Sequence, residues 1–225
     1  MKISKIIDIK KDKRVGLITT AIVMIVCLFL SASFPSENSF QTIVVNLIFL
    51  VILPAIYIKL ILRRKFAEFG LQKGSSNKGI IWMIVSFMFL SLFLYGAINY
   101  TRIAEDYWIM RFLKKNFLAF LIYQLSGGVI LAMVEFFFRG FVMHYFYDMF
   151  AKKYFAVIFQ FLVFTVFIWS TGALKFNWIV MVQVFLAFFS GIIAYKSKSI
   201  LYSYLFALIS NVVLGTVIIK MSYLN

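Results

Sequence analysis

The sequence predicts an all-α, polytopic membrane protein with about seven transmembrane helices. Of its 225 residues, 64% are hydrophobic and 14% are charged, and the mean hydropathy is +0.98. A soluble domain is about 45–50% apolar and about 25% charged. One water-facing globule could not bury so many apolar side chains, so lipid must be part of the solvent. A helix needs about 20 apolar residues to cross a bilayer. Apolar stretches of about that length recur along the whole chain.

Seven such stretches are expected as transmembrane helices, at 15–33, 40–62, 79–100, 117–142, 154–171, 177–195 and 200–219. The first follows basic residues and ends in Ser31-Ala32-Ser33, which resembles the cleavage site of a secretory signal peptide. Its apolar core is longer than the about 7–15 residues of a signal peptide, so we interpret it as a retained span. Pro54 in the second stretch predicts a kink.

The charged residues predict the orientation of the chain. The 23 Lys and Arg against 8 Asp and Glu give a net charge of +15, which in a soluble protein would indicate a nucleic-acid partner. Here the basic residues cluster at the ends of apolar stretches, so we expect a lipid bilayer as partner and no nucleic acid. The loops place sixteen Lys and Arg on one side and six on the other, with Arg139 inside a stretch. The positive-inside rule then predicts a cell-membrane protein whose basic N-terminus, 1–14, is cytosolic and whose C-terminus is external.

Two polar segments connect the expected spans. In residues 101–116, Ile103, Tyr107, Met110 and Lys114 fall near one face of a helix, which predicts a short amphipathic helix lying on the membrane. The stretch K-G-S-S-N-K, 73–78, is typical of a flexible connector and lies on the predicted cytosolic side.

The sequence offers little for a metal or a cofactor. Cys27 is the only cysteine and His144 the only histidine, whereas zinc requires three or four N, S or O ligands. We therefore expect no metal site, no cofactor and no internal disulfide.

Glu135 is the only acidic residue inside a predicted span, and Arg139 follows it by one helical turn. A charge at the centre of a membrane costs about 2.5–3.5 kcal/mol on insertion scales, so such residues are candidates for function. Positions i and i+4 share a helix face, so the two side chains can pair, and Arg139 could also reach the interface. At ~1.5 Å per residue, Glu135 is expected ~10 Å and Arg139 ~4–5 Å from the cytosolic end of the stretch. A pair that only holds helices together remains an alternative to a chemical role.

The stretch V-E-F-F-F-R-G, 134–140, resembles the first motif of the CAAX-protease and bacteriocin-processing family of intramembrane glutamic endopeptidases, which reads E-E-x-x-x-R. Glu135 and Arg139 match the second Glu and the Arg of this motif, and Val134 occupies the position of its first Glu. The family's H-x-x-x-N motif fits the last span, with Ala207 at the His and Asn211 at the Asn.

The family's middle motif, F-x-x-x-H, is nearest to Phe164 and Ile168, again without His. The resemblance covers roughly 115–215. It divides the chain into 15–114, with the N-terminal spans and the interfacial helix, and a CAAX-protease-like core, 115–219.

As the resemblance implies, the first Glu of the family activates a water molecule, and an Asn and a His hold the oxyanion. Val134, Ile168 and Ala207 supply neither the general base nor the oxyanion donor that peptide hydrolysis needs. Adjacent helical residues point about 100° apart, so the Glu135 side chain does not point where a Glu at position 134 would point. His144 is expected half a turn away from the face of Glu135. His144 is interpreted as an interfacial residue and not as a ligand.

The residues of the family's polar set that remain are Glu135, Arg139 and Asn211. We therefore predict an impaired endopeptidase that acts by binding a hydrophobic or prenylated peptide or a partner membrane protein. One alternative is an active endopeptidase that uses Glu135. Another is a transporter or channel component in which Glu135 carries a proton or cation, although inverted repeats and further intramembrane carboxylates, which would favour it, are not found.

Other polar or small residues in the spans are expected to join helices. Four polar side chains are predicted to hydrogen-bond between helices: Gln124, Ser126, Gln160 and Gln183. Gly127, Gly128 and Ala132 are predicted to allow the close approach of a neighbouring helix.

Overall fold

The computed structural model describes residues 2–35, 38–100, 116–171 and 178–221, with side chains from Val15 onward. Every regular element in these ranges is a helix, which confirms the all-α prediction. In the described chain, six helices are long and apolar enough to cross a membrane, and Tyr154–Ser170 is a shorter apolar helix of 17 residues. The protein is therefore a multi-pass membrane protein. The predicted interfacial helix at 101–116 lies, except for its last residue, outside the described residues.

The first two spans differ from simple α-helices. Helix α1 (Lys2–Ser33) begins well before the apolar stretch. The second span is a continuous run of four elements, α2 (Ser39–Asn46), η1 (Leu47–Ile52), α3 (Leu53–Ile56) and η2 (Tyr57–Ile61), of which η1 and η2 are π-helical.

Pro54 lies between the two π-helical segments, in the first turn of α3. Proline has no N–H to donate to the preceding turn, and π segments are frequent where a helical ladder is interrupted. The Tyr57 hydroxyl ties this span to α1 through Thr19 at 2.8 Å and Thr20 at 3.0 Å.

After the 3₁₀ turn η3 (Phe66–Phe69) comes the third span, α4 (Ser76–Tyr100). The fourth consists of α7 (Phe117–Glu135), the π-helical η4 (Phe136–Val142) and α8 (Met143–Met149). The predicted end of this helix at 142 is therefore wrong. The residues after 142 are mainly aromatic and stay helical until Phe150, whose φ of −97° and ψ of 137° end the helix.

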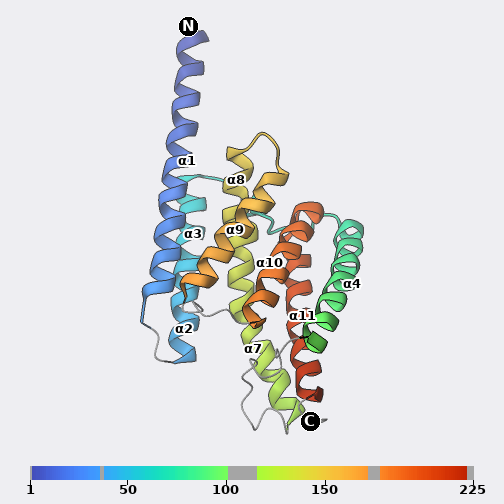
Figure 1. Ribbon diagram of the computed structural model, residues 1–225. Coiled ribbons are helices and arrows are strands. Elements are labelled where there is room, and N and C mark those ends of the chain that lie inside the picture. Colours follow the sequence, from blue (N-terminus) through green and yellow to red (C-terminus); the bar gives the residue numbers. More distant parts are fainter. Residues whose placement is uncertain (1, 36–37, 101–115, 172–177, 222–225) are drawn as a thin grey trace.

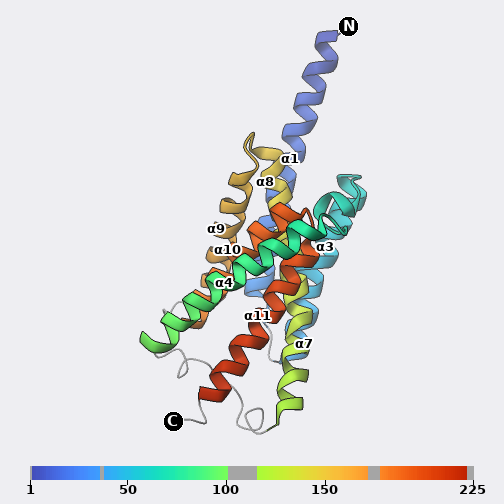
Figure 2. The ribbon, with the colours of Figure 1, turned by 90° about the vertical axis from the view of Figure 1, so that its right-hand side faces the viewer.

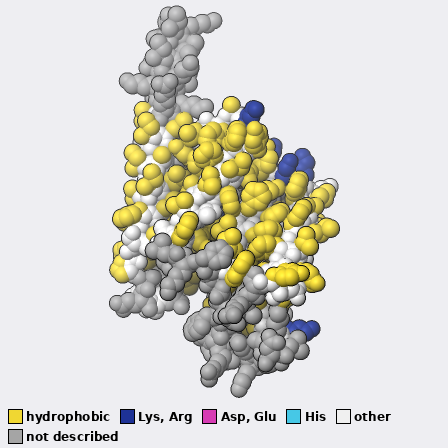
Figure 3. Space-filling model, viewed as in Figure 1, with side chains coloured by type: hydrophobic (Ala, Val, Ile, Leu, Met, Phe, Trp, Pro, Cys, Tyr) yellow, Lys and Arg dark blue, Asp and Glu magenta, His cyan; other side chains and the backbone are white. Residues whose placement is uncertain are grey.

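The remaining helices are α9 (Tyr154–Ser170), α10 (Trp178–Ser197) and α11 (Ile200–Met221). Figure 1 shows α1 and the second span on one side of the bundle, α7 to α9 in the middle, and α10, α11 and α4 on the other side. In Figure 2, α4 crosses the bundle at a slant, and the start of α1 and the end of α11 lie at opposite ends. The face in Figure 3 is covered with hydrophobic side chains, as expected of a surface in contact with lipid.

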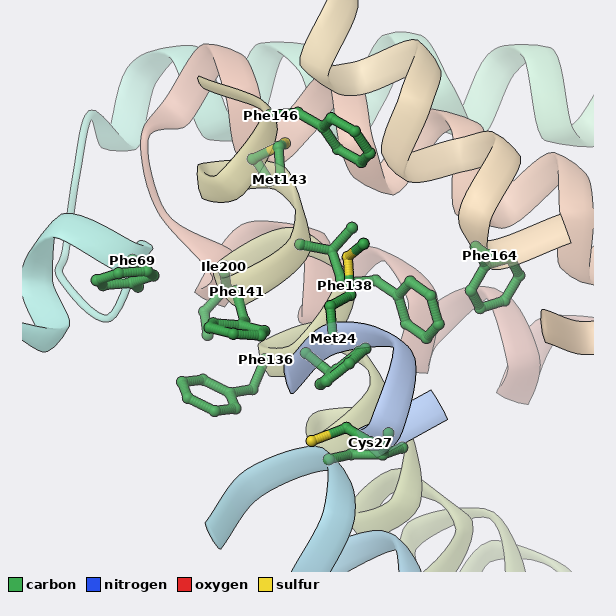
Figure 4. Close-up of a cluster of buried hydrophobic side chains, with 14 of the residues drawn as sticks. Met24, Cys27, Phe69, Phe136, Phe138, Phe141, Met143, Phe146, Phe164 and Ile200 are labelled. Atoms are coloured by element: carbon green, nitrogen blue, oxygen red, sulfur yellow. The ribbon is translucent and has the colours of Figure 1, made fainter. Parts of the chain in front are cut away.

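The main hydrophobic core surrounds η4, whose phenylalanines are fully or almost fully buried. Figure 4 shows Phe138 pointing toward Phe164 of α9, and their ring centroids lie 5.0 Å apart. Met24 and Cys27 of α1 close the same core. A second core joins α4, α10 and α11, where Phe93 and Phe185 stack at 4.6 Å. Both cores converge on the helices that carry the motif residues.

The predicted flexible connector is instead fixed to another part of the chain. The Ser75 N–H donates to the Ser197 carbonyl at 2.8 Å, the Ile200 N–H to the Gly70 carbonyl at 3.0 Å, and the Gln72 amide to the Lys198 carbonyl at 3.2 Å. Gly74, with φ of +60°, makes this approach possible, because a Cβ there would lie 2.2 Å from the Ser197 oxygen. The loop 62–75 is thus docked on the turn between α10 and α11.

The predicted contacts between helices have mixed outcomes. The Gln183 amide donates to Asn211 across α10 and α11 at 3.0 Å, as predicted. Ser126 instead donates to the Tyr123 carbonyl of its own helix. The Gln160 amide has no hydrogen-bond partner among the described residues. It packs against Gly191, where an added Cβ would lie only 2.4 Å from the Gln160 Nε2.

Gly128, Gly127 and Ala132 also differ from one another. A Cβ on Gly128 would meet Leu208 of α11 at 2.9 Å, which confirms the predicted close approach. Gly127 has nothing within 4 Å of its Cβ position, and Ala132 is exposed, so the prediction is wrong for these two.

Candidate functional site

The centre of the candidate site is a buried ion pair between Glu135, the last residue of α7, and Arg139 in η4. The Arg139 Nε lies 3.4 Å from the Glu135 Oε1, and both side chains are only 2% exposed. The carboxylate is therefore buried and paired with Arg139, as the i, i+4 spacing allowed. Arg139 does not reach the interface, because its Nη2 donates to the Ala187 carbonyl of α10 at 3.1 Å. Its Cζ also lies 5.1 Å from the centroid of the Phe164 ring, so the pair holds the fourth span against α9 and α10.

The pair does not satisfy all of its own polar atoms. The Glu135 Oε2, the Arg139 Nη1 and the Ser190 Oγ are buried and have no hydrogen-bond partner among the described residues. Most buried polar atoms in proteins do have one, so orphaned atoms of this kind call for an explanation. Their position therefore marks the region in which a polar ligand atom would be stabilised.

Beside the pair lies a very small cavity of about 10 Å³, here called the pair cavity. Val134, Glu135, Arg139, Ala207 and Ser190 are among its lining residues. A single water needs about 10–15 Å³ measured in this way. The pair cavity therefore has room for about one water and none for a peptide bond.

A larger cavity of about 310 Å³, here called the motif cavity, adjoins it along Val134, Phe164 and Gln183, which line both. The motif cavity is also lined by Ile168 of α9 and Asn211 of α11. The six residues singled out from the sequence, Val134, Glu135, Arg139, Ile168, Ala207 and Asn211, thus line two adjoining cavities between the same four helical segments.

The amide of Asn211 is engaged at both ends. Its Oδ1 accepts from Gln183, and its Nδ2 donates to the Ala207 carbonyl one turn earlier at 2.9 Å. An oxyanion donor must point at the position where the charge develops. In this arrangement one of the two Asn211 N–H groups is used within α11, and the bond from Gln183 makes Asn211 a link between α10 and α11.

Glu135 also lines a third space, an apolar groove of about 790 Å³, here called the lateral groove. Its walls come from the second span, the loop 62–75, α7, η4 and α11. Ala132 and Leu201 are exposed residues along it. Glu135 therefore lies between the pair cavity and the lateral groove.

Arg139 in turn lines a polar pocket of about 330 Å³, here called the basic pocket. On one wall, Arg64 forms ion pairs with Glu68 and Asp148. The hydrogen bond from Arg64, followed by that from the Lys65 backbone N–H, holds the pKa of the Glu68 carboxyl below its usual value. The ion pair thus connects two spaces of opposite character, with Glu135 facing the groove and Arg139 facing the pocket.

His144 lies in the basic pocket and not with Glu135, because the two residues line no common cavity. Its Nδ1 is 2.7 Å from the Gly140 carbonyl, and its ring packs against Phe69 and Tyr147. The described residues contain no group of three or more His, Cys, Asp or Glu side chains that could hold a metal ion.

Sequence reasoning missed the basic pocket, because its lining comes from four separate segments of the chain. The available signal was Asp148, an acidic residue close in the sequence to the basic residues Lys152 and Lys153. That Asn211 would be the partner of Gln183 was not predicted, because this pairing depends on the relative rotation of α10 and α11.

Comparison with protein-family models, with curated proteins and with solved structures gives no match for this chain. Its function must therefore be argued from the site itself.

Proposed function

We propose that this protein is a catalytically impaired relative of the CAAX-protease and bacteriocin-processing family. It binds a hydrophobic or prenylated peptide, or a helix of a partner membrane protein, in the motif cavity. The observation that carries the proposal is the gathering of Val134, Ile168, Ala207 and Asn211 beside the buried Glu135–Arg139 pair. These residues come from three helices, and their proximity supports the family arrangement.

The same residues argue against hydrolysis. Val134, Ile168 and Ala207 carry no proton-transfer group, and one of the two N–H groups of the Asn211 amide is already donated to the Ala207 carbonyl. Loss of a general acid–base group costs about 10²–10⁴-fold in rate, and loss of one oxyanion donor costs about 10²–10³-fold. Such losses are not additive, but either one alone removes most of the turnover.

Binding needs none of these groups. The motif cavity, at about 310 Å³, is at the lower end of the range of about 300–1,000 Å³ for ligand sites. Most of its lining is apolar, and Gln124, Gln183 and Asn211 supply amide groups. Gly127 is exposed at its edge, with open space at the Cβ position, so a side chain of a peptide has access there.

The test is binding of a fluorescein-labelled farnesylated peptide to the purified full chain, measured by anisotropy, together with a cleavage assay. Gly127→Leu adds a side chain at the edge of the motif cavity and should weaken binding about tenfold or more, since a few methylenes change pocket affinity by this amount. Gly96→Leu is the matched control, because Gly96 lies in α4, away from the cavity, and also has nothing within 4 Å of its Cβ position.

We expect binding without cleavage. Cleavage that Glu135→Gln abolishes would overturn the proposal in favour of an active endopeptidase. Equal binding by the Gly127→Leu and Gly96→Leu variants would remove the motif cavity as the binding site.

The location proposed is the cell membrane, with the N-terminus in the cytosol. The support is the positive-inside rule. The α8–α9 loop with Lys152 and Lys153 and the α10–α11 turn with Lys198 lie at the same end of the bundle (Figure 1).

A further inference from the structure

The basic pocket has an excess of positive charge that its own acidic residues do not balance. Its cationic lining residues are Arg64, Arg139, Lys153 and Lys198, and its acidic ones are Glu68 and Asp148. Both acids pair with Arg64. Among the described residues, the ammonium groups of Lys153 and Lys198 have no ion-pair or hydrogen-bond partner.

The inner wall of the pocket carries the second observation. Arg139 is 2% exposed, and its Nη1 has no hydrogen-bond partner among the described residues. Glu135 lies on the Nε side of this guanidinium, and Arg139 lines the basic pocket. Arg139 lines this pocket as well as the pair cavity, and a guanidinium in a pocket wall is suited to a phosphate, because guanidinium–phosphate hydrogen bonds are charge-assisted.

The lateral groove begins where the basic pocket ends. Gly70, Gln72 and Ile200 line both spaces. This shared wall is held by the hydrogen bond from the Ile200 N–H to the Gly70 carbonyl and by that from Gln72 to the Lys198 carbonyl. A molecule that crosses the wall would have one part among apolar side chains and the other among cations.

We infer that the lateral groove and the basic pocket together form a binding site for a phospholipid with an anionic headgroup. The acyl chain lies along Val51, Val129 and Leu201 in the groove, and the phosphate lies among Lys153, Lys198 and Arg139 in the pocket. The site shares no lining residue with the motif cavity and does not depend on the function proposed for that cavity.

A lipid is the occupant that fits both halves. The groove is walled by transmembrane helices, so molecules of the bilayer have direct access to it. Its volume of about 790 Å³ and its largely apolar lining suit an acyl chain. A soluble anion would use the pocket alone and would leave the groove without a role.

The test measures lipid binding to the purified full chain in detergent by native mass spectrometry. Phosphatidylglycerol is compared with phosphatidylcholine of the same acyl chains, and inorganic phosphate is added as a competitor. We expect phosphatidylglycerol to bind more tightly than phosphatidylcholine, and inorganic phosphate at millimolar concentration to displace little of it.

The charge test uses two double variants with the same change in net charge. Lys153→Gln with Lys198→Gln should weaken phosphatidylglycerol binding by roughly 30-fold, since one lysine near an anionic headgroup contributes about fivefold. Lys78→Gln with Lys152→Gln is the matched control, because both lysines are exposed and line neither space. Its affinity should stay within about twofold of the parent.

The groove test uses two leucines that are both 47% exposed. Leu201→Trp narrows the lateral groove and should weaken phosphatidylglycerol binding, whereas Leu162→Trp on α9 should leave it unchanged. Equal affinity for the two lipids, or equal effects of the two double variants, would overturn the inference. Full displacement by inorganic phosphate together with no effect of Leu201→Trp would also overturn it, and would indicate a soluble anion. Gly127→Leu should leave lipid binding unchanged, which separates this site from the motif cavity.

Discussion

Replacing Glu135 and Arg139 with apolar residues, singly and together, tests how strongly the buried pair is coupled. The atoms Nε and Oε1 lie 3.4 Å apart, and two unit charges at that distance attract by about 5 kcal/mol at an effective dielectric constant of about 20. Removal of one partner of a buried pair costs about 3–5 kcal/mol, while replacement of both by apolar groups is often neutral or stabilising. We therefore expect Glu135→Leu and Arg139→Met each to lower the free energy of unfolding by a few kcal/mol, and the double variant to lose less than either.

The two single variants should also differ from each other. A carboxyl group left alone in an apolar site can take up a proton and become neutral, whereas a guanidinium cannot lose its proton in a protein. Glu135→Leu, which strands the guanidinium, should therefore be the more destabilising change. The loss in free energy of unfolding should be largest for Glu135→Leu, smaller for Arg139→Met and smallest for the double variant.

Unfolding of the purified protein by titration with sodium dodecyl sulfate, followed by circular dichroism, gives these free energies. The matched control is the cycle of Arg64→Gln and Glu68→Gln, a pair with side chains 32% and 45% exposed, for which coupling below about 1 kcal/mol is expected. If the double variant at 135 and 139 loses the sum of the single losses, the two charges are not coupled and the reasoning is refuted.

Three further predictions concern packing, pH and topology. Gly191→Ala should destabilise the bundle by about 1–3 kcal/mol in the same titration, because its Cβ would lie 2.4 Å from the Gln160 Nε2; Gly96→Ala, with open space around it, should cause no such loss. Because the pKa of Glu68 is lowered in the folded state, its contribution to stability is complete above the unfolded pKa of about 4.3 and is lost as the pH falls below it. The difference in melting temperature between the parent and Glu68→Gln should therefore shrink from pH 6 to pH 3, and a constant difference would contradict this. Finally, a Lys13→Cys variant in a Cys27→Ala background should resist a membrane-impermeant maleimide added to intact cells, and labelling from outside would reverse the proposed topology.

Much of the fold could be predicted from hydropathy alone, because in a membrane the backbone must satisfy its hydrogen bonds within each helix. All seven apolar stretches coincide with helices of the structure, although that at Tyr154–Ser170 is short. The end of the fourth span was misplaced because aromatic residues such as Tyr145 and Phe146 continue a helix beyond the strongly apolar core. The π-helical segments were also missed, since the residues of Leu47–Ile52 and Phe136–Val142 are equally compatible with an α-helix.

At the site, the sequence identified the pair but not its surroundings. Glu135 and Arg139 could be paired from their spacing, because i and i+4 positions meet on any helix. The hydrogen bond from Arg139 to the Ala187 carbonyl depends on how α10 packs against η4, which no local pattern encodes. For the same reason, the predicted hydrogen bonds of Ser126 and Gln160 to other helices are absent from the described structure.

The docking of the loop 62–75 on the turn between α10 and α11 has a consequence for biogenesis. Gln72 and Lys198 are 126 residues apart in the chain, and at about 5–20 residues per second the ribosome needs roughly 6–25 s to make the intervening segment. During that interval the loop has left the ribosome, but the turn that accepts its hydrogen bonds has not been made. The lateral groove and the basic pocket share this wall, so both are completed only when the last two helices enter the membrane. A nascent chain arrested before α11 would therefore already carry Lys153 and Lys198 but would lack Ile200, which lines both spaces, and Leu201 of the groove.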